Sequence, residues 1–184
     1  SDGERLLHRD SGRPQPRDAS LNGQSREEGG FDPDCENQQA RGDHLGGRKH
    51  GEWIECADSG DVAYRLNYIH GKRHGTWEAY WTTGDQGGTL KTKGGYQDGQ
   101  RYGMWSHYHE NSKLKEYGLY LNGKKHGKWI SDYETGQRDT ETEFQTGKKH
   151  GSLRWYHENG QLAFEGPYRH GRPHGMWRSY RENG

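Results

Sequence analysis

The sequence predicts an all-β protein, an elongated single-layer antiparallel meander of about six 24-residue β-hairpin repeats. Three observations support this fold class. The element Gly-x-x-x-Gly recurs six times from residue 47 onward at a nearly constant interval. Stretches of strand length flank each copy, and their apolar and polar residues alternate, as in half-exposed strands. The apolar surface comes largely from 7 Trp and 12 Tyr, which favour strands.

The second glycine of each element sets the register of the repeat. Successive copies lie 24 residues apart, except for one interval of 28, where extra residues fall near 85–88. A histidine precedes this glycine in five copies, and a tryptophan follows it by two positions in five. The exceptions are Tyr102 and Leu153. Such regularity indicates one supersecondary unit repeated along the chain. The glycines are Gly51, Gly75, Gly103, Gly127, Gly151 and Gly175.

Glycine-rich turns separate the strands of each unit. The stretches "NGKKHG" and "ENGQ" match hairpin chemistry, because glycine readily adopts the positive φ that such turns require. Gly94, Gly118 and Gly166 recur inside the first strand of their repeats. A missing side chain there lets a neighbouring indole ring lie flat on the backbone. The sequence therefore predicts that a neighbouring tryptophan packs on each of these three glycines.

The chain divides into a polar extension, rich in Gly, Arg and Asp, over residues 1–43 and repeats over residues 44–184. The extension has one aromatic residue, Phe31, and no strand or helix periodicity. Such a composition cannot bury enough apolar surface to fold alone. We expect this N-terminal arm to be ordered only where it rests on a partner.

Charge and cysteine content restrict the function classes. Lys plus Arg and Asp plus Glu number 27 each, so no net field attracts nucleic acid, and no nucleic-acid partner is expected. Cys35 and Cys56 allow one disulfide or two free thiols, and the sequence leaves both open. A bridge would favour an oxidising compartment. With a sequence that begins at Ser1, this favours a leader-processed periplasmic or extracellular protein.

The pattern Tyr-x-x-Gly-x-x-x-Gly-x-Trp, with Asn-Gly nine residues on, resembles MORN repeats. It is most similar to the bacterial MORN-variant class, in which Trp replaces the second glycine of His-Gly-x-Gly. The resemblance covers roughly residues 44–184 and departs at Tyr102, Leu153 and Ser112. It implies a β-hairpin ribbon used in protein–protein assembly. Some members are described as antitoxins and others as lipid-associated scaffolds, and the family carries over no catalytic residues.

The sequence predicts no enzyme activity, cofactor, metal site or small-molecule substrate. Equivalent histidines of adjacent repeats stand two strands apart, about 9–10 Å, too far to share one zinc ion. Asp139, Glu141 and Glu143 alternate along one strand and are typical of a solvated face. The repeat pattern is not interrupted to build a pocket.

The predicted function is that of an accessory or assembly subunit of a larger complex. A single sheet leaves one aromatic face without a second layer, and exposed apolar patches mark interfaces. We expect this face and the N-terminal arm to contact another protein subunit. Alternatives are an antitoxin or immunity protein and a lipid-surface scaffold; lipid contact is not favoured, because a basic turn edge is usually a solubilising rim. The candidate interface residues are Trp77, Tyr80, Trp105, Tyr108, Tyr120, Trp129, Trp155, Tyr156, Tyr168, Trp177 and Tyr180, and the basic turn edge comprises Lys72, Arg73, Lys124, Lys125, Lys148 and Lys149.

Overall fold

The structure is a computed structural model and describes residues 33–35, 40–82 and 88–183. Most of the predicted N-terminal arm, residues 1–32 and 36–39, lies outside the described residues. The first strand begins at Arg41, so the sheet starts within the segment that we expected to precede the repeats.

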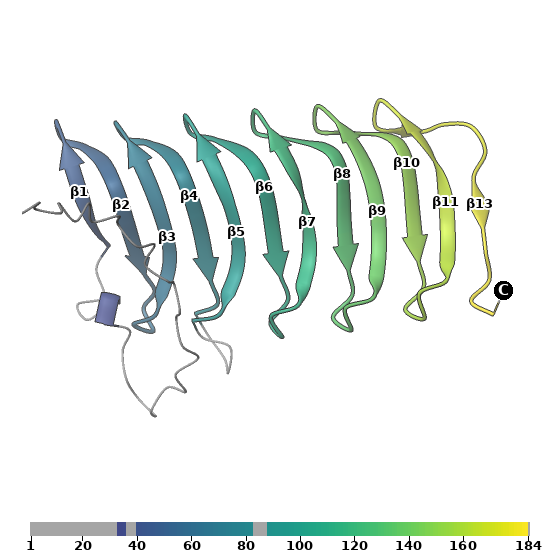
Figure 1. The fold of residues 1–184 in the computed structure, drawn as a ribbon, viewed down its shortest axis with the longest axis horizontal. Coiled ribbons are helices and arrows are strands. Elements are labelled where there is room, and N and C mark those ends of the chain that lie inside the picture. Colours follow the sequence, from purple (N-terminus) through teal and green to yellow (C-terminus); the bar gives the residue numbers. More distant parts are fainter. Residues whose placement is uncertain (1–32, 36–39, 83–87, 184) are drawn as a thin grey trace, which may run out of the picture. The chain divides into compact units, whose positions relative to one another are not determined.

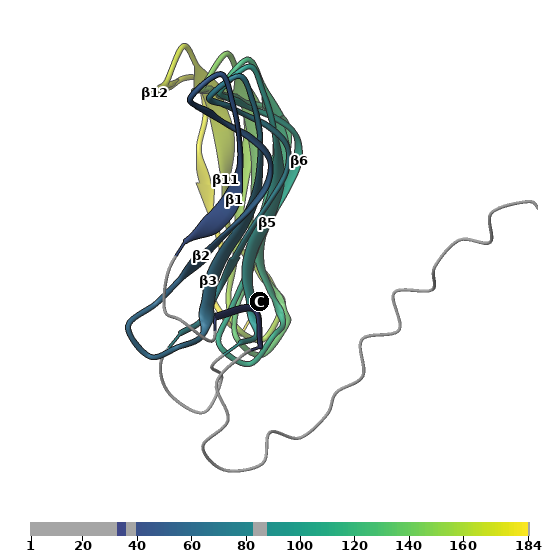
Figure 2. The same cartoon turned by 90° about the vertical axis from the view of Figure 1, so that its left-hand side faces the viewer.

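The described residues form one open sheet of thirteen antiparallel strands, in which consecutive strands are neighbours, except that the last two both pair with the strand before them (Figure 1). The view along the sheet shows a single curved layer (Figure 2). This confirms the predicted all-β meander of hairpin repeats. The elements are η1 (Pro33–Cys35), β1 (Arg41–Leu45), β2 (Arg48–Cys56), β3 (Val62–Ile69), β4 (Lys72–Tyr80), β5 (Leu90–Gln97), β6 (Gln100–Tyr108), β7 (Leu114–Leu121), β8 (Lys124–Asp132), β9 (Arg138–Gln145), β10 (Lys148–Tyr156), β11 (Leu162–Arg169), β12 (Arg172–Pro173) and β13 (Arg178–Ser179).

The two glycines of each Gly-x-x-x-Gly element have different roles. Asn122 (φ 50°) and Gly123 (φ 74°) make the two-residue turn between β7 and β8, and both need positive φ, as in a type I′ hairpin. Gly127 (φ 67°) lies inside β8, where the register with β7 shifts. This β-bulge absorbs the extra residues and brings Trp129 opposite Gly118. The Gly-x-x-x-Gly element is therefore a tight turn followed by a bulge.

Backbone hydrogen bonds tie each hairpin turn to the previous one. The first glycine of a turn donates its N–H to the carbonyl of the second turn cation one repeat earlier, as from Gly147 to Lys125 at 2.9 Å. The same bond runs from Gly123 to Arg101 at 2.9 Å. The turn edge of the sheet is therefore a ladder, which fixes the spacing of the repeats.

The core of the sheet consists of indole rings lying on glycines. A Cβ added to Gly94 or Gly118 would overlap the ring of the tryptophan on the next strand, and one added to Gly166 would overlap Trp177, which lies between β12 and β13. Trp105 and Trp129 are 0% and 1% exposed, although a single layer has no second sheet to cover them. The predicted packing of tryptophan on glycine is confirmed at these positions.

The last hairpin is irregular. The strand that returns after Gly171 is broken into β12 and β13, and both pair with β11. Pro173 lacks the N–H that would extend the ladder, and His174 N–H instead donates to Pro167 O at 2.9 Å. About twelve strands were expected, and the thirteenth results from this break.

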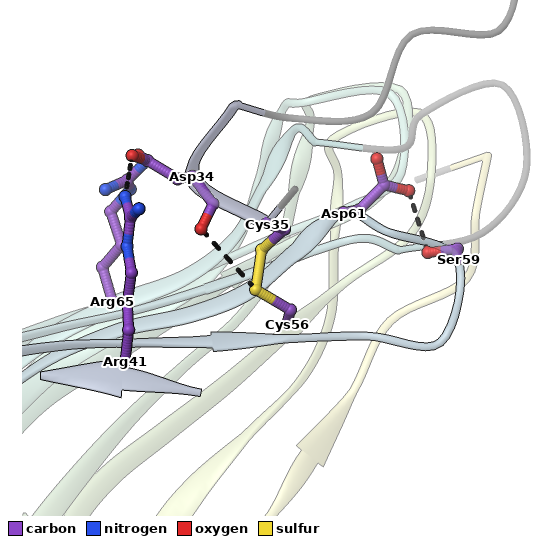
Figure 3. The surroundings of a disulfide bond; sticks show 7 residues. All are labelled: Asp34, Cys35, Arg41, Cys56, Ser59, Asp61 and Arg65. Carbon is purple, nitrogen blue, oxygen red and sulfur yellow. Dashed lines mark hydrogen bonds and ion pairs between the residues drawn. A yellow bond between two sulfur atoms is a disulfide. The ribbon is translucent and has the colours of Figure 1, made fainter. Parts of the chain in front are cut away.

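A disulfide attaches η1 to the sheet (Figure 3). It joins Cys35 to Cys56 at the end of β2, and the sequence had left this pairing open. Cys35 packs with Ile54 and Val62 in a small buried cluster. Asp34 forms ion pairs with Arg41 of β1 and Arg65 of β3, so η1 is bound to the sheet by charge as well.

Candidate functional site

Strand alternation gives the sheet two different faces. We call the face that carries the tryptophans the Trp face. Cross-strand pairs place Gly118 between Trp105 and Trp129, and Thr142 between Trp129 and Leu153. A second row of rings (Tyr68, Tyr96, Tyr120, Phe144 and Tyr168) runs beside the tryptophans, nearer the hairpin turns.

The centre of the Trp face is buried by its own side chains. The Trp105 ring stacks with Trp77 at 5.3 Å and meets Tyr96 and Tyr120 edge-on at 5.4 and 5.7 Å. These offset and T-shaped contacts are the favourable arrangements of aromatic pairs. The indole N–H of Trp105 donates to Gly95 O at 3.1 Å, and that of Trp129 donates to Leu119 O at 3.0 Å. Trp105, Trp129 and Tyr120 (7% exposed) are therefore core residues, although the sequence placed them in a candidate interface.

Cations from the hairpin turns cover this aromatic surface. Lys125 Nζ lies 3.8 Å from the ring centre of Trp129, and the Arg101 guanidinium lies 4.5 Å from that of Trp105. Arg73 and Lys149 lie over Tyr96 and Tyr168 in the same way. Such cation–π contacts are favourable, and they cover the ring faces in the absence of a second sheet.

The predicted basic turn edge consequently divides into two rows. The second cation of each turn, such as Arg73, Lys125 or Lys149, folds onto the Trp face. The first cations, Lys72, Lys124 and Lys148, stay exposed at the turn edge. From the sequence, the two cations of a turn were predicted to form one group. They separate because successive side chains along a strand point to opposite faces.

Four predicted interface tyrosines lie on the opposite face. Tyr80 donates to Glu78 at 2.7 Å and Tyr180 donates to Glu165 at 3.0 Å, and both carboxylates belong to the opposite face. Tyr108 and Tyr156 follow the same alternation along β6 and β10. The expectation of one aromatic face holding all eleven residues was therefore wrong, because these tyrosines stand an odd number of positions from the tryptophans.

The opposite face carries a network of ion pairs. Glu141 lies 2.8 Å from Lys128 and 2.8 Å from Arg138, and Arg154 approaches it at 3.9 Å. The hydrogen bond from Lys128 and the nearby positive charges hold the pKa of the Glu141 carboxyl below its usual value. Glu141 was predicted to lie on a solvated strand face. Its ion pairs instead connect β8, β9 and β10.

Two adjacent exposed aromatic side chains of the Trp face lie on β10 and β11. Repeat five carries Leu153 at the usual tryptophan position and Trp155 two residues later. Trp155 and Phe164 are 44% and 40% exposed, and their rings stack at 5.7 Å with an angle of 12°. They border a shallow cleft of about 340 Å³ with Tyr133 and Tyr180. The displaced tryptophan is visible in the sequence, and it is the signal that could have singled out this pair.

The hydrogen bonds of Trp155 fix its orientation. Its indole N–H donates to Asp139 Oδ1 at 2.8 Å and to Tyr133 Oη at 3.2 Å. Tyr133 in turn donates to the carbonyl of Tyr156 at 2.8 Å. An exposed ring held by such bonds presents the same apolar surface to any partner.

Trp77, Tyr168 and Trp177 complete the predicted interface set. All three lie on the Trp face and are half-buried, and Trp177 meets Tyr168 edge-on at 5.3 Å. Trp177 covers Gly166 as Trp129 covers Gly118. These residues contribute both to packing and to the accessible rim of the face.

Within the described residues, no group of three or more His, Cys, Asp or Glu side chains is placed to hold a metal ion. No described helix has the length and apolar character needed to span a membrane.

Comparison with known families agrees with the repeat register. The family model described as "MORN repeat variant" matches residues 101–122 and 149–170. Each match begins at the second cation of one hairpin turn and ends in the turn of the next repeat, so both cover the same structural unit. No curated protein matches the chain. The recurrent unit, its indole-on-glycine packing and the family match at two repeats together support the predicted assignment of the chain to the MORN-repeat proteins.

Proposed function

We propose that this chain is a protein–protein interaction module, an accessory or assembly subunit of a larger complex, that performs no catalysis itself. MORN repeats generally serve as protein- or lipid-binding modules. The observation that carries the proposal is the exposed, stacked pair of Trp155 and Phe164. The partner contacts the Trp face at this pair, near the C-terminal end of the sheet.

The surroundings of the pair suit an interface anchor. Interface energy concentrates in a few aromatic residues that a partner can desolvate fully. Hydrogen bonds to Asp139 and Tyr133 hold Trp155 in place before any partner arrives. Little side-chain entropy is then lost on binding, which improves affinity.

Charge placement favours a protein partner over a lipid surface. Several turn cations lie over aromatic rings of the Trp face, as Lys125 does over Trp129. Across the whole chain, Lys plus Arg and Asp plus Glu number 27 each, so the chain has no net positive charge. An anionic membrane attracts segments through several free basic residues acting together.

Two further parts of the proposal rest on the N-terminal region. The arm, residues 1–32 and 36–39, is proposed to contact the same partner, because its composition is that of a segment that orders on binding. The disulfide between Cys35 and Cys56 supports a periplasmic or extracellular location, since such bonds persist in oxidising compartments.

Cross-linking with mass spectrometry, on complexes from the native source at low salt, tests the proposal. The wild-type chain is compared with Trp155→Ala/Phe164→Ala and with a control, Met104→Ala. Met104 is 58% exposed and pairs with Leu119 on the opposite face. We expect one protein to link in fixed stoichiometry to the wild type and the control, and at least tenfold less to the double variant.

Two results would contradict the proposal. A chain that runs as a monomer with internal links only is not an obligate subunit, and a free toxin-neutralising protein then becomes the better interpretation. Equal links from the double variant and the wild type would remove the aromatic pair from the interface.

A further inference from the structure

Several histidines of the described sheet have a clear local hydrogen-bond partner. His107 contacts Thr92 Oγ1 through Nδ1 at 3.1 Å, and burial lowers its pKa. His109 Nε2 lies 2.8 Å from the carbonyl of Asp132 at the end of β8, and His157 Nε2 lies 3.2 Å from that of Tyr180 just after β13. His50 and His150 differ, because their Nδ1 atoms are buried and have no hydrogen-bond partner among the described residues. A buried ring nitrogen without a partner is costly and calls for a ligand.

Each of these two histidines faces a second imidazole. The rings of His50 and His70 lie 5.5 Å apart, and those of His150 and His170 lie 5.4 Å apart. The interplanar angles, 53° and 59°, are also similar. The same arrangement therefore occurs twice, 100 residues apart in the sequence.

The pairs arise from the hairpin turns. His70 and His170 occupy the first turn position, with φ values of 50° and 54°. The three repeats between them carry Asp98, Asn122 and Thr146 at that position. Each pair thus connects the bulge of one repeat with the turn of the next. These pairs join different positions of adjacent repeats, whereas equivalent histidines of adjacent repeats stand two strands apart.

The ring separation matches that of two imidazoles on one metal ion. With metal–nitrogen bonds of about 2.0–2.1 Å, two ligating rings at a tetrahedral angle have centres roughly 5 Å apart. Imidazole suits ions such as Zn²⁺, Cu²⁺ and Ni²⁺. Since the described residues offer no third protein ligand, water would complete the coordination. His70 and His170 are exposed, so each pair borders solvent on one side, and an ion would pass these rings to reach the buried Nδ1 atoms of His50 and His150.

We propose that His50–His70 and His150–His170 are two equivalent bis-histidine sites for a divalent transition-metal ion of the zinc, copper and nickel class. Each ion bridges two successive repeats. One site joins the first two repeats and the other joins the last two. Metal binding would therefore crosslink neighbouring repeats at each end of the array. This inference is independent of the protein-binding function proposed above.

Metal titration of the full-length, tag-free chain tests the proposal. Isothermal titration calorimetry with Ni²⁺ in a non-chelating buffer measures the number of ions bound per chain. The variants are His70→Asn and His170→Asn, singly and together. Asparagine tolerates positive φ and already occupies this turn position as Asn122, so the turns should survive. The control is His126→Asn, because the turn position of the following repeat, equivalent to His70 and His170, is Thr146 and not a histidine.

The measured quantity is the change in stoichiometry between variants. We expect each single variant to bind one ion fewer than the wild type, the double variant two fewer, and the control the same number. Ni²⁺ should also raise the melting temperature of the wild type but not that of the double variant, since a ligand of the native state stabilises it. A stoichiometry unchanged in the double variant, or absence of Ni²⁺ binding by the wild type, would overturn the proposal.

Copper supplies an independent readout at the same sites. The electron paramagnetic resonance spectrum of one Cu²⁺ per chain should show hyperfine coupling to two equivalent imidazole nitrogens in the wild type. This pattern should disappear in the double variant and persist in the His126→Asn control. A wild-type spectrum of aquo copper would count against the sites, and the paired rings would then be a packing feature alone.

Discussion

The indole ring of Trp129 covers the α-carbon of Gly118 on the adjacent strand so closely that no Cβ fits between them. Gly118 is also the cross-strand partner of Trp105, so one glycine lies between two buried tryptophans. This relationship explains how a one-layer sheet excludes water from its centre. The indole ring packs flat on the glycine backbone, and neighbouring rings and cations cover the rest of its surface.

Gly118→Ala should destabilise the sheet by about 1–3 kcal/mol, because the new methyl group must displace a buried ring. Chemical denaturation followed by tryptophan fluorescence measures the change. The chain contains a matched alternative, since Thr142 faces Leu153 at the next junction. In a Trp129→Leu background the added methyl group should therefore cost less. Equal costs in both backgrounds would show that the ring is not what excludes a side chain at residue 118.

Lys125→Ala should lower the free energy of unfolding by about 1–2 kcal/mol, whereas Lys124→Ala should change it little. Lys125 lies 3.8 Å from the Trp129 ring centre and 2.5 Å from a Glu116 oxygen. Lys124 is exposed on the turn edge. The expected size follows from a partly desolvated cation–π contact. Equal effects of the two substitutions in urea denaturation would contradict the division of the turn cations into two rows.

Replacing both cysteines by serine should cost about 3 kcal/mol of stability, because the disulfide closes a loop with a sequence separation of 21 residues. The loss should appear in the first repeats, where Cys35 packs with Ile54 and Val62. Hydrogen exchange of β2 and β3 amides is the local measurement. Reducing agent should reproduce the effect in the wild type and do nothing to the Cys35→Ser/Cys56→Ser variant. A response of that variant to the reductant would mean that another process is being observed.

Acid should weaken the opposite face through Glu141. Its pKa is lowered in the folded chain by Lys128, with Arg138 and Arg154 nearby. A carboxyl with a depressed folded pKa stabilises the protein above its ordinary pKa of about 4.3, and this stability is lost as pH falls through the folded value. The unfolding free energy of Glu141→Gln should therefore decrease less than that of the wild type between pH 7 and pH 3. Parallel pH profiles would show that the Glu141 ion pairs contribute no stability.

Local sequence signals determined the repeat, its register and the class of fold. Gly-x-x-x-Gly, the preceding histidine and the following tryptophan are each set by residues a few positions apart, and hairpin turns obey such local rules. Gly94, Gly118 and Gly166 could also be assigned to indole packing, because only a missing side chain makes room for a ring. The pairing of Cys35 with Cys56 could be named as one alternative but not chosen, since it depends on where η1 rests.

The tertiary structure alone decided which side chains meet. A bulge at residues such as Gly127 changes the register within a strand, so the residues that stand opposite each other on adjacent strands cannot be counted from the turn. It placed Tyr80 and Tyr180 on the opposite face and Lys125 over Trp129. It also set His50 against His70 across a repeat junction. Contacts between strands depend on register and twist in three dimensions, whereas a periodic sequence specifies only the unit that is repeated.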